Sequence, residues 1–95
     1  MLTKALALEL APYNILVNAI APGGIRTPGT QALQEPLLAI GSDPTEYNNS
    51  FMARLPLGRM GRPDDIAKVA LFLTSSAADY MTGSLLVVDG GYLLS

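Results

Sequence analysis

An apolar segment that runs into a proline–glycine turn, ILVNAIAPGGIRT at residues 15–27, carries the clearest structural signal in the chain. Its first part, Ile15 to Ile20, is short, rich in β-branched residues and almost wholly apolar. That composition is typical of a strand covered on both faces, as in a parallel sheet. Asn18 interrupts the run, and its amide either bonds to neighbouring backbone or positions an adjacent site.

The segment before this strand predicts a helix. Residues 2–11, LTKALALELA, are strong helix formers with apolar side chains around most of the circumference, so we expect burial on more than one side. No capping residue precedes Leu2, which indicates a chain that begins inside a helix. We expect Pro12 to end the helix by pushing Ala11 out of the helical region, and Asn14 to take the left-handed conformation of a helix-ending turn.

The C-terminal third predicts one more helix and one more strand. Pro63-Asp64-Asp65 places proline and acids where a helix begins, and apolar residues recur at helical spacing to Leu73. Residues 75–83 form a connector, Leu85 to Val88 predicts a second buried strand, and Asp89-Gly90-Gly91 predicts a turn. The order of helix, strand, long loop, helix and strand is typical of an α/β fold, as the tail of an alternating parallel sheet.

A long, proline-rich connection separates the two predicted strands. Within it, residues 30–40 are a weak helix candidate, and Asp43-Pro44-Thr45-Glu46 is a good start for a helix that reaches about Leu55. Connections of this length are usually functional or carry their own helices. Its apolar residues suit either a closing flap or ordinary core: Leu33, Leu37, Leu38, Phe51, Met52 and Leu55.

Composition narrows the function classes. Hydrophobic residues make up 49% of the 95 and charged residues only 15%, so much of the surface is expected to meet other protein; a compact, unusually apolar small domain is the alternative. A net charge of −2 without a basic stripe argues against nucleic acid as a partner. With no cysteine and no histidine, and with its acids at caps and turns, the chain predicts no metal site. No apolar run is long enough for a membrane helix, and no secretory signal is visible, so we expect a soluble, cytoplasmic protein.

Four segments together resemble the short-chain dehydrogenase/reductase family. They are LTKALALELAPYNILVNAIAPG (2–23), PGGIRT (22–27), PLGRMGRPDDIA (56–67) and YMTGSLLVVDGG (80–91), in family order and at family-like spacing. The resemblance implies that residues 1–95 are the C-terminal part of a single doubly wound, Rossmann-like domain, with residues 28–62 as an inserted substrate lid. Family members often carry a basic residue where this chain has Leu16.

The resemblance also assigns a cofactor site. In an open parallel sheet, ligands bind beyond the carboxyl ends of the strands, where Pro22 to Thr27 lies. By family pattern Pro22, Gly23, Ile25 and Thr27 bind NAD or NADP, with the Ile25 backbone on the nicotinamide carboxamide and the Thr27 hydroxyl on the carboxamide or the pyrophosphate. Two adjacent glycines leave the backbone bare for the approach of a flat ring. Without the other three segments, the preferred interpretation is that Pro22-Gly23 is only a sharp turn and Thr27 only a helix cap.

The family's catalytic pair is absent from this stretch. Its chemistry uses a tyrosine with a lysine four residues later, and none of the four tyrosines here has lysine at that position. The pair and the glycine-rich pyrophosphate loop are expected upstream of Met1, so the resemblance implies an oxidoreductase acting on a small alcohol or ketone, without catalytic residues in these 95. The chain alone is therefore expected to be inactive. Family members form dimers or tetramers, which implies a homo-oligomer; the alternative is a truncated remnant that retains only association.

Overall fold

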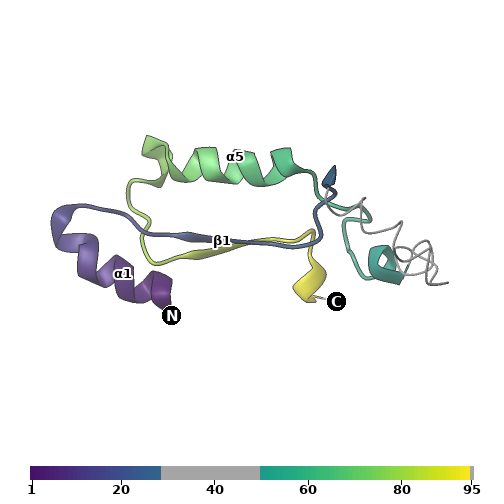
Figure 1. Ribbon diagram of the computed structural model, residues 1–95, viewed down its shortest axis with the longest axis horizontal. Coiled ribbons are helices and arrows are strands. Elements are labelled where there is room, and N and C mark those ends of the chain that lie inside the picture. The colour runs from purple at the N-terminus through teal and green to yellow at the C-terminus, as the bar shows by residue number, and fades with distance from the viewer. Residues whose placement is uncertain (29–49, 95) are drawn as a thin grey trace. The chain divides into compact units, whose positions relative to one another are not determined.

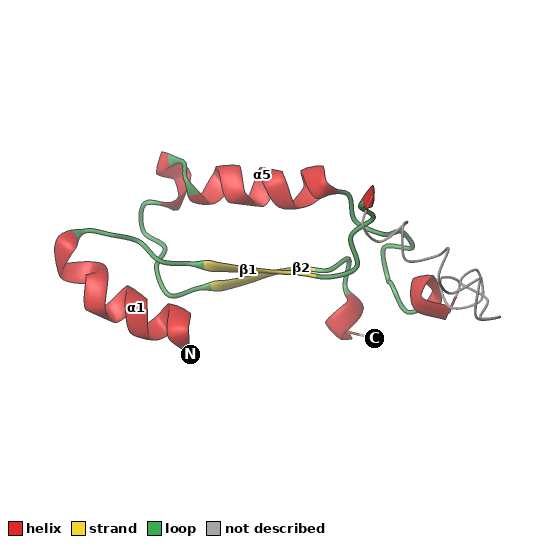
Figure 2. Cartoon of the chain, viewed as in Figure 1, coloured by secondary structure: helices red, strands yellow, loops and turns green. Residues whose placement is uncertain are grey.

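The computed structural model describes residues 1–28 and 50–94. They form helix α1 (Leu2–Leu10), strand β1 (Ala19–Pro22), helix α5 (Pro63–Leu73) and strand β2 (Leu85–Val88), with short 3₁₀ turns at η1 (Ala11–Tyr13), η2 (Ser76–Ala78) and η3 (Tyr92–Leu94) (Figures 1 and 2). The chain divides into two compact units. The first unit consists of residues 1–22 and 64–88. The second unit consists of residues 23–63 and 89–95, and its described parts are 23–28, 50–63 and 89–94.

The first unit is built on a parallel pair of strands. Ala19 of β1 lies opposite Leu85 of β2, and the register continues to Pro22 opposite Val88. Helix α5 runs along one side of this pair and α1 lies on the other (Figure 1). The parallel sheet flanked by helices confirms the predicted α/β class, and α5 and β2 begin at the residues predicted from the sequence.

The bounds predicted for the first strand were wrong. The sequence placed it at residues 15–20, whereas β1 covers Ala19–Pro22. The reason lies at Asn18, whose amide nitrogen donates to the Met81 carbonyl at 3.0 Å while its side-chain oxygen accepts from the Ser84 amide at 3.0 Å. Backbone bonds join Val17 to Gly83 at 2.7 Å and Ala19 to Ser84 at 2.9 Å, and between them the Asn18 side chain makes the bonds to Met81 and Ser84. This confirms the interpretation of Asn18 as an amide bonded to neighbouring backbone.

The end of α1 also corrects a prediction. Ala11, immediately before Pro12, has φ −56° and ψ −40° and remains in the right-handed helical region. The chain tightens into η1 with proline in its first turn, where the missing N–H is not needed. Asn14 ends this turn with φ 58°, as predicted. The restriction that proline places on the preceding residue is a tendency, and here it does not hold.

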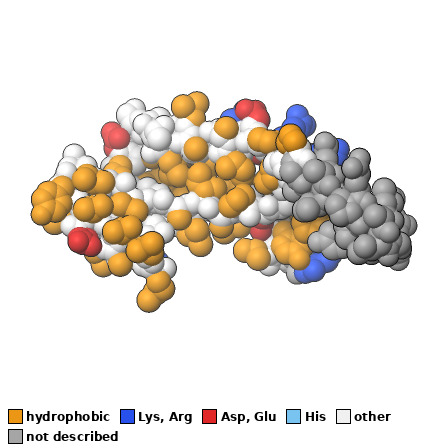
Figure 3. Space-filling view, viewed as in Figure 1, with side chains coloured by type: hydrophobic (Ala, Val, Ile, Leu, Met, Phe, Trp, Pro, Cys, Tyr) orange, Lys and Arg blue, Asp and Glu red, His pale blue; other side chains and the backbone are white. Residues whose placement is uncertain are grey.

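Few apolar side chains of the first unit are covered by the described residues. Ala7 and Ala78 are buried, at 4% and 0% exposure, whereas Leu8 of α1 and Leu85 of β2 remain exposed. Along β2 exposed and half-buried residues alternate, so one face of this strand is covered and the other is not. Figure 3 shows apolar side chains over α1 and along the strands on the face in view. The sequence predicted that both faces of this strand would be covered. The described residues cover one of them.

The predicted helix at residues 30–40 lies outside the described residues. Of the helix predicted from residue 43 to about Leu55, only the last part is described, and residues 50–53 are helical. Leu55, at 5% exposure, is the buried apolar residue of the second unit among those described. None of the helices in the described ranges has the length and apolar content needed to cross a membrane.

Candidate functional site

The loop that follows β1 carries the residues predicted to bind a cofactor. Pro22 is the last residue of β1 and is exposed. Gly23, Ile25 and Thr27 follow in the second unit and are half-buried, whereas Arg26 is exposed. The structure thus places the predicted residues of the second unit along one short loop, which we call the cofactor loop (residues 23–27).

Gly61 fixes the backbone of the cofactor loop. Its amide donates to the Gly24 carbonyl at 2.9 Å, and its carbonyl accepts from the Arg26 amide at 2.8 Å. These two bonds make Ile25 and Gly61 a parallel bridge. In such a bridge the polar groups of the central residue point to the opposite side from those of its neighbours. The Ile25 amide and carbonyl are therefore directed away from Gly61.

Gly23 sits directly against the turn that follows β2. A Cβ atom at Gly23 would lie 2.7 Å from the Asp89 Cβ and 2.8 Å from its Cα, closer than real Cβ atoms come. The Asp89 carboxylate holds its own turn, because Oδ1 accepts from the Gly91 amide at 2.9 Å and Oδ2 accepts from the Leu93 amide at 3.0 Å. Glycine is required at residue 23 by this contact with a fixed neighbour.

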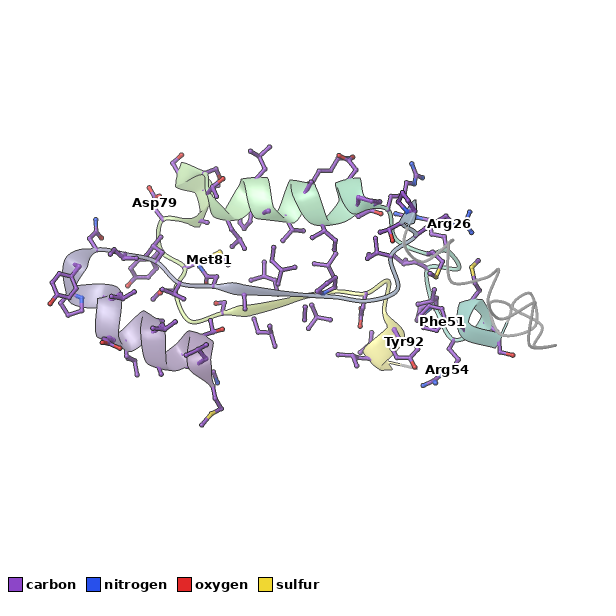
Figure 4. All side chains as sticks on the ribbon, viewed as in Figure 1. Arg26, Phe51, Arg54, Asp79, Met81 and Tyr92 are labelled. Carbon is purple, nitrogen blue, oxygen red and sulfur yellow. The ribbon has the colours of Figure 1, made fainter. Side chains whose placement is uncertain are left out.

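Gly24 is packed by an aromatic ring. A Cβ atom there would lie 2.6 Å from Cε1 of Phe51, so the ring stands directly against the loop backbone. Phe51 stacks on Tyr92 with a centroid distance of 5.2 Å, and the Arg54 guanidinium lies 4.6 Å from the Tyr92 ring centroid. Figure 4 shows these three side chains grouped together. The sequence predicted that the bare backbone would admit a flat ring. Within the described residues, the ring that lies against Gly24 is that of Phe51.

A second connection joins the segment around Gly61 to the C-terminal turn. The Leu57 amide donates to the Gly90 carbonyl at 3.2 Å, and a Cβ atom at Gly91 would meet Pro56 at 2.8 Å. Residues 56–61 therefore contact the turn after β2 at one end and the cofactor loop at the other. Each segment is recognisable in the sequence, but these contacts are not, because they join residues far apart in the chain.

The acids do not form a metal site among the described residues. Asp64 pairs with Lys68 at 3.1 Å on the surface of α5, with both side chains mostly exposed. The Asp89 carboxylate is occupied by backbone amides. Both positions agree with the interpretation of these acids as caps and turn residues.

The donor set of the cofactor loop fits a nicotinamide. A carboxamide presents two N–H donors and one carbonyl acceptor, and a main-chain residue supplies one donor and one acceptor. Ile25 directs both of its main-chain groups to one side, and the Thr27 hydroxyl lies two residues further on.

Comparison with known proteins identifies the family. A family model described as enoyl-(acyl carrier protein) reductase matches residues 1–93. The chain belongs to the short-chain dehydrogenase/reductase family. Among curated family members, the 3-oxoacyl-[acyl-carrier-protein] reductase of Aquifex aeolicus is 46% identical over 94% of this chain and 32% of its own length. The 2-dehydro-3-deoxy-D-gluconate 5-dehydrogenase of Bacillus subtilis is 45% identical over 97% of this chain and 33% of its own.

Solved structures of the family superpose closely. A short-chain dehydrogenase family protein from Francisella tularensis gives a TM-score of 0.86 at 37% identity, covering 99% of this chain and 39% of its own. A candidate 2-deoxy-D-gluconate 3-dehydrogenase from Agrobacterium tumefaciens, solved with bound NADP, gives 0.83 at 47% identity, covering 99% and 35%. The fold is thus that of Rossmann-type short-chain dehydrogenases. The chain spans about a third of the length of the curated relatives it matches.

Proposed function

We propose that this chain supplies the nicotinamide-binding loop and part of the substrate loop of an NAD(P)-dependent oxidoreductase that transfers hydride between nicotinamide and an alcohol or ketone. The observation that carries the proposal is the cofactor loop, tied by Gly61 on one side and packed on Asp89 on another. Membership of an oxidoreductase family and an NADP-bound structural relative support it.

Residues of this chain have binding and orienting roles in the proposal. The Ile25 main chain accepts from and donates to the nicotinamide carboxamide, and the Thr27 hydroxyl bonds to the carboxamide or the pyrophosphate. Pro22 ends β1, and Gly23 begins the loop that carries these groups. The nicotinamide, when bound, supplies the hydride chemistry itself. Because the loop is held at both Gly23 and Gly24, its groups are oriented before the cofactor arrives.

Within this proposal residues 1–95 are part of one Rossmann-like domain, and residues 28–62 form the substrate-lid insertion. The catalytic tyrosine and lysine come from outside the stretch, because no tyrosine here has lysine four residues later. Relatives of nearly equal identity are named for an acyl-carrier-protein thioester and for a keto sugar acid, so identity does not choose the substrate.

Exposed apolar side chains favour a second property, association with other protein. Leu2 and Leu8 of α1, Leu85 of β2 and Leu71 of α5 are each more than 60% exposed. Apolar surface of this kind on two helices and a strand is covered in most folded proteins. We propose that further chain, a second subunit or both cover it, as in a homo-oligomeric dimer or tetramer. A remnant that retains only this association is the alternative function.

A cofactor-consumption assay separates the two functions. The complete polypeptide that carries this chain is mixed with NADPH or NADH and a panel of carbonyl substrates comprising a β-ketoacyl thioester, a keto sugar acid and a small ketone. The proposal expects oxidation of one cofactor with at least one substrate class, and none by the 95 residues alone. If the complete polypeptide neither binds nor oxidises either cofactor, the enzyme proposal is wrong and the association module is favoured.

A further inference from the structure

The C-terminal turn reaches the cofactor loop along two routes within the second unit. Asp89 packs directly on Gly23. Three residues later Tyr92 stacks on Phe51, and the edge of the Phe51 ring stands against Gly24. Two adjacent residues of the loop are therefore held by the same short turn. Gly23 contacts the first residue of the turn, and Gly24 is held through the rings of Phe51 and Tyr92, which Figure 4 labels.

Tyr92 is itself well fixed. Its amide donates to the Asp89 carbonyl at 3.2 Å, and the Asp89 carboxylate bonds to the amides on both sides of it, at Gly91 and Leu93. Phe51 and Arg54 stand three residues apart at the end of the described helical turn, a spacing that places them on one face. Both use that face to contact the Tyr92 ring. The ring of Tyr92 is thus the common partner of two side chains from the lid segment.

Phe51 has a direct effect on the loop because nothing separates its ring from the Gly24 backbone. The approach is so close that even a methyl group at residue 24 would overlap the ring. Gly24 in turn accepts the hydrogen bond from Gly61 and precedes Ile25. Met60 Sδ is the other near neighbour, 3.2 Å from a Cβ atom placed at residue 24. A displacement of the Phe51 ring would remove the nearest contact of Gly24 and loosen the backbone that orients Ile25.

We propose that Tyr92 is a positioning residue for the cofactor loop, acting through Phe51: the ring pair holds Phe51 against Gly24 and so fixes the main chain at Ile25. Its effect on nicotinamide binding rests on the proposed function, whereas its effect on the loop does not. Arg54, over the same ring, strengthens the arrangement by a cation–π contact. The role belongs to the ring of Tyr92, so phenylalanine at that position preserves it and leucine does not.

Amide hydrogen exchange of the complete polypeptide without nucleotide tests the coupling. Tyr92→Leu and Phe51→Leu are each expected to raise exchange at residues 24–27 by about two- to tenfold, the range of a lost aromatic pair. Tyr92→Phe should stay near the wild type, and so should Tyr80→Leu, the matched control at a fully exposed ring. Protection of the β1 amides is the check that the protein remains folded; if Tyr92→Leu lowers it, Arg54→Met is the milder variant, with a smaller rise confined to the same loop.

A double variant decides whether the effect passes through Phe51. Tyr92→Leu should add little to the exchange rate when Phe51 is already leucine. Three results would overturn the proposal. They are unchanged exchange at residues 24–27 in Tyr92→Leu, a rise in Tyr92→Phe equal to that in Tyr92→Leu, and full additivity of the two effects in the double variant. In the active enzyme Tyr92→Leu should raise the KM for the nicotinamide cofactor several-fold while kcat changes less. If the wild type binds no nicotinamide nucleotide, the proposed function fails, and the exchange experiment still decides the role of Tyr92.

Discussion

Replacing Gly23 with alanine should destabilise the second unit through steric overlap, since Gly23 is not among the glycines with positive φ. The added Cβ would lie 2.7 Å from the Asp89 Cβ and 2.8 Å from its Cα. Carbon atoms in favourable contact are about 3.5–4.0 Å apart, so the overlap is close to 1 Å. The neighbour cannot rotate away, because one of the two atoms is backbone and the Asp89 side chain is bonded to two amides.

Overpacking of this kind costs about 1–3 kcal/mol, and we expect Gly23→Ala to lower the free energy of unfolding by an amount in that range. The shift needed to relieve the overlap would move the cofactor loop, so cofactor binding should weaken as well. Urea denaturation of the complete polypeptide gives the free energy, and the midpoint should fall without a change of slope.

Gly58 provides the matched control. A Cβ atom there meets nothing within 4 Å, but its φ of +73° is unfavourable for a residue with a side chain. Asparagine tolerates that conformation better than alanine, so Gly58→Asn should recover part of what Gly58→Ala loses. At Gly23 neither alanine nor asparagine should be tolerated, because the constraint is space. A Gly23→Ala protein within about 0.5 kcal/mol of the wild type, the spread of ordinary surface changes, would refute the reasoning.

Three further outcomes are expected. Thr27→Val should weaken cofactor binding by about 0.5–2 kcal/mol, the value of one hydrogen bond; an unchanged dissociation constant in a fluorescence titration would refute this. Asn18→Ala leaves two backbone groups without their side-chain partner and should lower the free energy of unfolding, measured by urea denaturation, by about 1–3 kcal/mol. Lys68→Ala removes an exposed ion pair and should change that free energy by less than about 1 kcal/mol. The isolated 95 residues should self-associate in sedimentation, and a monodisperse monomer with strong amide protection would contradict that.

Local signals in the sequence were enough to predict part of the fold. Proline followed by two acids marks the start of α5, and a short apolar run before Asp-Gly-Gly marks β2, because caps and turns depend on neighbouring residues. The start of β1 was misplaced because Asn18 bonds to residues more than sixty positions away, which no local pattern reveals. At Ala11 the prediction failed because the effect of a following proline is a tendency, and this residue stays in the right-handed helical region.

In the candidate site, too, local features were predicted from the sequence and long-range contacts were not. The cofactor loop was predicted because its residues are contiguous and match a family motif. Its supports were not predicted, since Phe51, Gly61 and Asp89 approach it from distant parts of the chain. The reason offered for adjacent glycines, bare backbone for a flat ligand, also proved incomplete. Within the described residues the space beside Gly23 and Gly24 is taken by Asp89 and by the Phe51 ring.

The most direct test of the nicotinamide-binding proposal is the Ile25 amide itself. In the complete polypeptide, isotope-labelled for nuclear magnetic resonance, the Ile25 signal is followed during titration with NADP⁺ or NAD⁺ and, in parallel, with the corresponding ADP-ribose, which lacks the nicotinamide. We expect a saturable shift of the Ile25 amide with the dinucleotide and little change with ADP-ribose. If the dinucleotide binds and the Ile25 amide does not respond, or responds equally to ADP-ribose, the loop does not bind the nicotinamide.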